Sequence, residues 1–153
     1  MTSFNYQHIL LAADFSEDFN NVSRKAQSLA QRFNAKLSLI HVLDNIPMPD
    51  MPYGTVIKPD VDYGNDLLEQ EKQRFSDFCQ QLDIAEENRW LVWGIPKQAI
   101  TQLAKQQNVD LIVTGSHGRH GLALLFGSTT DDIVHHAPCD VLAVNLKNQA
   151  ATT

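Results

Sequence analysis

The stretch VDLIVTGSHGRHGLALLFGST, residues 109–129, joins a short apolar run to a glycine-rich segment. Its first part, VDLIVTG, is continuously apolar rather than alternating, which is typical of a parallel strand covered on both faces. Its second part, together with the end of that run, holds four of the chain's seven glycines, at Gly115, Gly118, Gly121 and Gly127. The stretch therefore predicts a buried strand that leads directly into a turn with unusual backbone freedom.

Similar apolar runs, rich in β-branched residues, recur along the chain. Four of them predict further strands: HILLAA (8–13), KLSLIHVL (36–43), RWLVWG (89–94) and DVLAVNL (140–146). Between the strands, apolar residues at helical spacing predict helices over 16–33, 64–82 and 96–107, and Ser128 opens a short last helix. This alternation predicts an α/β fold, a single doubly wound parallel five-stranded sheet that is Rossmann-like, with helices on both faces.

One segment does not fit the alternation. Residues 44–62, DNIPMPDMPYGTVIKPDVD, hold four of the six prolines, so they can form neither a helix nor a central strand. They predict a long mobile loop after the second strand, and loops of this kind are often functional lids or else disordered. With 153 residues and no internal repeat, we expect one domain over residues 1–147, followed by a short C-terminal tail, 148–153.

Charge and composition exclude several classes of function. A net charge of −6 argues against nucleic acid or a membrane surface as a partner, because both favour a basic face. The N-terminal MTSFNYQHILLAAD has no basic region and only a short apolar run, so we expect neither a secretory signal nor a transmembrane helix. Cys79 and Cys139 have no metal-binding or redox spacing, which favours reduced thiols in a cytoplasmic protein.

Ligands of open α/β sheets bind beyond the carboxyl ends of the strands, where the strand order reverses. If the strands 8–13 and 109–115 are central neighbours, the loop AADFS (12–16) meets the glycine-rich stretch at this point. Glycines there can form a nest of N–H groups, and a helix beginning at Ser128 adds the positive end of its dipole, so phosphate is the natural ligand. The stretch is neither a Walker A loop nor a dinucleotide fingerprint. Simple turn and C-cap glycines remain the alternative.

Histidines near the glycines raise the question of a metal site. His117 and His120 fall in the predicted loop, and His135 and His136 are adjacent and cannot share one face of a helix. A dedicated zinc site is therefore disfavoured. Arg119 and the two loop histidines are expected to contact phosphates or solvent.

The sequence offers no clear catalytic residue. Asp14 can bind a ribose hydroxyl or Mg²⁺, or it can cap the first helix. No serine stands in a G-x-S-x-G elbow, and no general base is placed on a nucleophile. We therefore assign no catalytic residue, and little enzymatic activity is expected.

Several motifs together carry a resemblance to a known family. These are DFS (14–16), HV (41–42), G-x-P (94–96), DLIVTGSHGRHG (110–121), GST (127–129) and PCDVLAV (138–144). They resemble the universal stress protein A family over nearly the whole chain. The resemblance implies the adenine nucleotide alpha hydrolase-like form of the Rossmann-like fold.

The ATP-binding branch of that family carries the motif G-x2-G-x9-G-[ST]. Gly115, Gly118, Gly127 and Ser128 match its residue types, although only eight residues separate Gly118 from Gly127. The resemblance implies that ATP, or AMP or ADP, is bound with or without Mg²⁺. It places these three glycines, Ser128 and the backbone N–H of Thr129 on the phosphates and ribose, and Asp14 and Val42 on the ribose and adenine. The expected reversal of strand order and the family resemblance together predict the nucleotide-binding residues. They are Ala12, Ala13, Asp14, Val42, Gly115, Ser116, His117, Gly118, Arg119, Gly127, Ser128 and Thr129.

Three functions fit this sequence. The first is a stress-response or signalling module whose nucleotide-bound state is read by an unknown protein partner. The second is a slow ATPase or phosphotransferase, and the third is a nucleotide-free structural or adaptor dimer. A homodimer through the last strand, 141–146, is expected because an open apolar edge strand tends to pair, and the resemblance implies the same contact.

Overall fold

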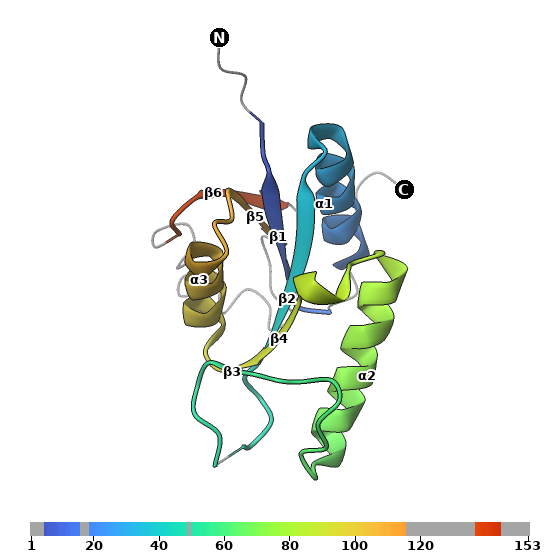
Figure 1. Cartoon of the computed structure of the whole chain (residues 1–153), viewed down its shortest axis with the longest axis vertical. Coiled ribbons are helices and arrows are strands. Elements are labelled where there is room, and N and C mark those ends of the chain that lie inside the picture. Colours follow the sequence, from blue (N-terminus) through green and yellow to red (C-terminus); the bar gives the residue numbers. More distant parts are fainter. Residues whose placement is uncertain (1–4, 16–18, 49, 116–136, 145–153) are drawn as a thin grey trace.

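The computed structural model describes residues 5–15, 19–48, 50–115 and 137–144 (Figure 1). The helices within these ranges are α1 (Phe19–Phe33), α2 (Asp66–Gln81) and α3 (Pro96–Gln106), with a 3₁₀ turn at Glu86–Asn88. The strands are β1 (His8–Ala13), β2 (Lys36–Leu43), β3 (Thr55–Val56), β4 (Arg89–Trp93), β5 (Leu111–Gly115) and β6 (Asp140–Val144).

All six strands form one sheet in the order β3-β4-β2-β1-β5-β6. The five longer strands are parallel to their neighbours, and β1 lies between β2 and β5. The chain moves outward from β1 through β2 to β4, and then returns across α3 to β5 on the other side of β1. This is the predicted doubly wound α/β fold, and the strand order reverses between β1 and β5.

The described residues form one strand more than the five predicted, because the proline-rich segment 44–62 contributes the short strand β3. Thr55 and Val56 pair antiparallel with Trp93 and Val92 at the edge of the sheet. The backbone N–H of Gly54 also donates to the Trp93 carbonyl at 2.7 Å. The strand stays within a proline-free stretch and occupies an edge, which is where a sheet tolerates nearby prolines.

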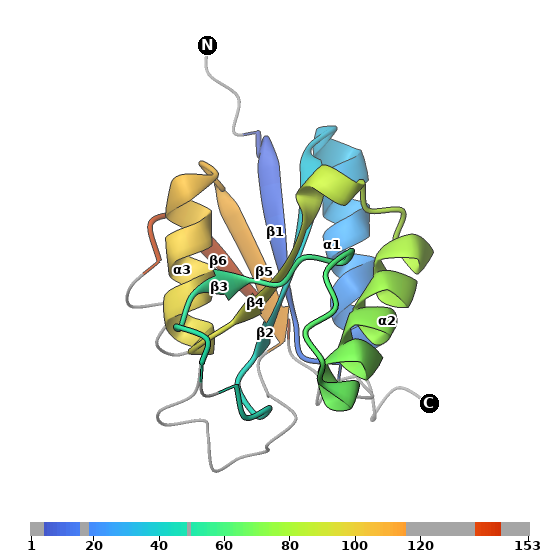
Figure 2. The same ribbon diagram turned by 60° about the horizontal axis from the view of Figure 1, so that its bottom comes forward.

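The sheet has a helix layer on each face. Figures 1 and 2 show α1 and α2 on one side and α3 on the other. Side chains alternate along β1 accordingly: Ile9 and Leu11 pack toward α1 and α2, whereas Leu10 and Ala12 pack toward α3. Both faces of β1 are therefore covered, which explains its continuously apolar sequence.

The helix ends follow local signals. The Asn65 side chain caps α2 by accepting a hydrogen bond from the Leu68 N–H at 3.1 Å, and Pro96 stands in the first turn of α3 as predicted. Residues 16–18 and the helix expected from Ser128 lie outside the described residues. Within the described part of the chain, no helix is long and apolar enough to cross a bilayer.

His8 is buried at the amino end of the sheet. Its Nδ1 lies 3.1 Å from the Gln107 carbonyl oxygen and its Nε2 lies 2.7 Å from Ser38 Oγ. Because a carbonyl can only accept, Nδ1 carries the proton of the neutral ring and Nε2 accepts from the Ser38 hydroxyl. Burial lowers the pKa of His8 below its ordinary value of 6.5, so the neutral ring is favoured in the folded protein.

We therefore expect stability to fall as the pH drops below about 6.5, because the unfolded chain then takes up a proton at His8 that the folded chain does not. The contribution is fully present above this pH. The urea midpoint measured between pH 7.5 and pH 5.5 checks this, with His8→Asn as a non-titrating comparison. The variant should show a shallower decline, and equal declines in both proteins would exclude His8 as the cause.

Candidate functional site

The carboxyl ends of β1 and β5 meet at one edge of the sheet, which Figure 2 turns toward the viewer. β1 ends at Ala13 and β5 at Gly115, and the two strands pair in register from Ile9 with Leu111 onward. On the other side of β1, Ala13 pairs with His41 of β2, one residue before Val42. The fold therefore brings Ala12, Ala13, Asp14, Val42 and Gly115 to the carboxyl edge of the sheet, near the point where the strand order reverses.

These five residues differ in what they can offer a ligand. The side chains of Ala12 and Val42 are buried in the core on the α3 side, so any contact of these two residues with a ligand at the edge would come from their backbone groups. Asp14 and Gly115 are half-buried. Of these five residues, Asp14 is the one that brings a carboxylate, and together with backbone groups it suits a small polar ligand.

The other predicted site residues lie outside the described residues. They are Ser116, His117, Gly118, Arg119, Gly127, Ser128 and Thr129. Within the described ranges, no group of three or more histidines, cysteines or carboxylates could hold a metal ion.

Two side chains from other elements anchor the backbone on either side of Asp14. His41 Nδ1 donates a hydrogen bond to the Ala13 carbonyl at 2.8 Å. Arg74 of α2 donates from Nη2 to the Phe15 carbonyl at 3.0 Å. The carbonyl groups before and after Asp14 are therefore both fixed, one from β2 and one from α2.

A sequence profile of the universal stress protein family matches residues 5–145. The chain belongs to this family. Two relatives in Coxiella burnetii are similar over nearly the whole length. Universal stress protein A homolog 2 is 38% identical, and the match covers 94% of this chain and 97% of that protein. Universal stress protein A homolog 1 is 34% identical, and the match covers 94% of this chain and 99% of that protein. The resemblance inferred from the motifs is thus confirmed.

Solved structures agree with the fold. The universal stress protein UspA from Lactobacillus plantarum is 28% identical, with a TM-score of 0.61, and the match covers 93% of this chain and 99% of that one. A universal stress protein solved in complex with cAMP has a TM-score of 0.63 over 94% of this chain and 99% of its own. At 20% identity, this second likeness concerns the fold alone.

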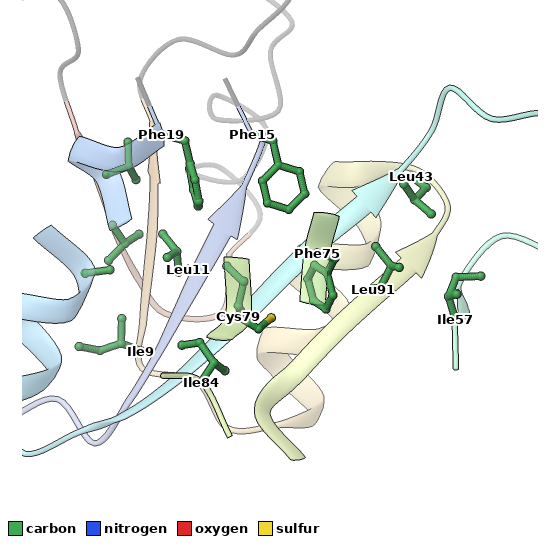
Figure 3. Packing of buried hydrophobic residues seen from close by; sticks show 14 of the residues in the cluster. Ile9, Leu11, Phe15, Phe19, Leu43, Ile57, Phe75, Cys79, Ile84 and Leu91 are labelled. Atoms are coloured by element: carbon green, nitrogen blue, oxygen red, sulfur yellow. The ribbon is translucent and has the colours of Figure 1, made fainter. Parts of the chain in front are cut away.

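Phe15 of this universal stress protein has an unusual backbone. Its φ is +57°, in the left-handed region, which costs a bulky residue about 1–2 kcal/mol. Its ring is nevertheless buried in the cluster of apolar side chains beyond the end of β1 (Figure 3). The centroid of the Phe15 ring lies 4.2 Å from that of the His41 ring and 4.8 Å from that of the Phe78 ring. The Arg74 guanidinium lies 5.1 Å from the ring centroid. This packing offsets the strained torsion.

Sequence reasoning missed this anchoring. The HV motif pointed to His41 but gave it no role, and Arg74 was one polar residue among many on a predicted helix. A positive φ is signalled in a sequence by glycine or asparagine, and phenylalanine gives no such signal. Only the packing of α2 against the loop after β1 shows that these residues meet.

The proline-rich segment lines a hollow of about 550 Å³ at the carboxyl end of β4. The lining residues are Pro47, Met48, Met51, Pro52, Tyr53 and Trp93. The Trp93 indole N–H donates to the Met51 carbonyl at 3.1 Å, and the rings of Tyr53 and Trp93 lie 5.8 Å apart. The segment is thus attached to the same edge of the sheet that carries the candidate site.

Proposed function

We propose that this universal stress protein binds ATP or a related adenine nucleotide, AMP or ADP, at the carboxyl edge between β1 and β5. The observation that carries the proposal is that Asp14 follows β1 and Gly115 ends β5, the two neighbouring strands between which the strand order reverses. Gly115 begins the glycine motif that ends in Gly127 and Ser128. The cAMP complex of a protein with the same fold supports an adenine nucleotide as the ligand class.

Each part of the nucleotide has a chemical counterpart among these residues. The Asp14 carboxylate accepts hydrogen bonds from ribose hydroxyls or holds Mg²⁺, and the backbone of Val42 reads the adenine edge. The glycines from Gly115 to Gly127 let backbone N–H groups approach the phosphates closely, and His117 and Arg119 add positive charge.

The function we propose is that of a binding module rather than an enzyme. No lysine lies between Asp110 and Lys147, so the glycine stretch has no lysine of its own to reach the transferred phosphate as in a P-loop. The bound state would then be read by a protein partner in a stress or signalling response. Slow hydrolysis is the second candidate, and phosphate release over hours from protein mixed with ATP separates the two.

Asp14→Ala tests the proposal most simply. Hydrogen bonds to a charged group contribute about 1.5–3 kcal/mol, so the variant should bind ATP roughly 10- to 100-fold more weakly in a calorimetric titration. Asp60→Ala is the matched control, because Asp60 is exposed in the segment 44–62. Equal affinities for the two variants would remove Asp14 from the site.

The nucleotide that the protein carries can be identified directly. Denaturing freshly purified protein and separating the supernatant by chromatography should release ATP, ADP or AMP. The nucleotide-free adaptor is favoured instead if nothing is released and none of the three, added with Mg²⁺, changes the melting temperature.

We also propose that the protein forms a homodimer through β6, which ends the sheet. Val141 and Leu142 are half-buried and Ala143 is exposed on this edge strand. Ala143→Arg would place like charges face to face across a two-fold axis, so light scattering should show a dimer for the wild type and a monomer for the variant. A variant with the mass of the wild-type dimer would reject this contact.

A further inference from the structure

Two side chains from other elements hold the backbone of the loop after β1. His41 fixes the carbonyl before Asp14 at 2.8 Å, and Arg74 fixes the carbonyl after it at 3.0 Å. Asp14 and Phe15 therefore lie between two anchored carbonyl groups. Anchoring this two-residue segment at both ends limits the directions in which the Asp14 side chain can point.

The same two anchoring side chains also hold the strained torsion of Phe15. The His41 ring packs 4.2 Å from the Phe15 ring, and the Arg74 guanidinium lies 5.1 Å from it on another element. A left-handed phenylalanine persists only when its surroundings determine it, and such strain is concentrated at ligand sites. If this torsion relaxed, the chain would leave β1 in a different direction.

Helix α2 supplies one anchor and supports the other. Glu71 and Arg74 lie one turn apart on α2, and the Glu71 carboxylate is 3.9 Å from His41 Nε2. Arg74 donates directly to the loop at Phe15. Glu71 lies beside the His41 imidazole, which holds the loop at Ala13. A helix far from the glycine motif in the sequence is thereby joined to the predicted ribose contact.

We infer that His41 and Arg74 are positioning residues that hold Asp14 in the orientation that a nucleotide's ribose requires. The inference rests on the proposed function. Neither residue needs to touch the nucleotide, because both act through the backbone of the loop. A carboxylate fixed in advance loses less conformational entropy when the nucleotide binds.

Arg74→Met tests this inference with two readouts. In nucleotide-free protein, the backbone ¹³C chemical shifts of Phe15 report its positive φ, and they should move toward the values of an ordinary negative φ. In a calorimetric titration, ATP should bind about tenfold more weakly than to the wild type. Arg24→Met, at an exposed position on α1, is the matched control and should change neither readout.

Conservative variants separate positioning from a general loss of structure. Arg74→Lys keeps one donor for the Phe15 carbonyl and should recover part of the affinity. If Arg74→Met fails to fold, His41→Asn is measured in its place. The asparagine amide keeps a donor near the position of His41 Nδ1, but the imidazole ring that packs against Phe15 is lost. We expect this variant to lose less ATP affinity than His41→Ala.

The outcomes distinguish this inference from the proposed function. If the wild type binds ATP and Arg74→Met binds it within twofold, or if the Phe15 shifts are unchanged in the folded variant, the inference alone is overturned. If the wild type binds no adenine nucleotide, the proposed function fails and the inference fails with it.

Discussion

Replacing Gly127 with valine is expected to abolish a nucleotide-induced rise in melting temperature of roughly 5–10 °C. At a hundredfold excess of ATP over its dissociation constant, binding adds about 2.7 kcal/mol to the free energy of unfolding. For a domain of this size, each kcal/mol raises the melting temperature by roughly 2–4 °C. Valine resists a positive φ, and its branched side chain would occupy the space where the phosphates are expected.

The comparison requires that the nucleotide-free variant melts as the wild type does. Ala85→Val is the matched control, because it places the same side chain at an exposed position with extended backbone before the 3₁₀ turn. Its melting temperature should rise with ATP as in the wild type. If Gly127→Val also shows the full rise, Gly127 does not contact the phosphates.

The second large effect concerns the core beneath the site. Leu39 of β2 is fully buried, and Leu39→Ala should cost about 2–5 kcal/mol of unfolding free energy through lost apolar contacts and the cavity left behind. This corresponds to a fall in melting temperature of roughly 10 °C. Leu67→Ala on α2 makes the same substitution at a side chain that is 57% exposed, and it should cost little.

Chemical denaturation of the two leucine variants checks this difference. The sheet holds the site in place through β2, so the Leu39 variant should also bind nucleotide more weakly near its own melting temperature. Equal losses of stability in the two variants would contradict the packing of β2 described above.

The fold could be predicted from the sequence because its signals are local. A continuous apolar run predicted β2 over the same residues that form it. Apolar residues at helical spacing, together with Pro96, predicted α3. β3 could not be predicted in this way, because a strand of two residues is too short to show a hydrophobic pattern. Its partner strand also lies more than thirty positions away in the sequence. The prolines around β3 suggested a loop, and only its contact with Trp93 makes it an edge strand.

The candidate site was predictable in position but not in its supporting contacts. Asp14 follows one predicted strand and Gly115 ends another, so the topological rule alone places them at one edge. The partners of the loop after β1 come from β2 and α2, and no local pattern links Arg74 to Phe15. Positioning contacts of this kind depend on tertiary packing, which a single sequence does not display.

The central claim, an adenine nucleotide at the carboxyl edge between β1 and β5, is tested most directly by a titration of ¹⁵N-labelled protein with ATP and Mg²⁺, followed by NMR of the backbone amides. We predict saturable shifts for Ala13, Asp14, Val42 and Gly115, with the amides of Gln7 and Asp110 at the opposite edge unchanged. An unchanged spectrum at millimolar ATP, or shifts confined to the opposite edge, would contradict the proposed site.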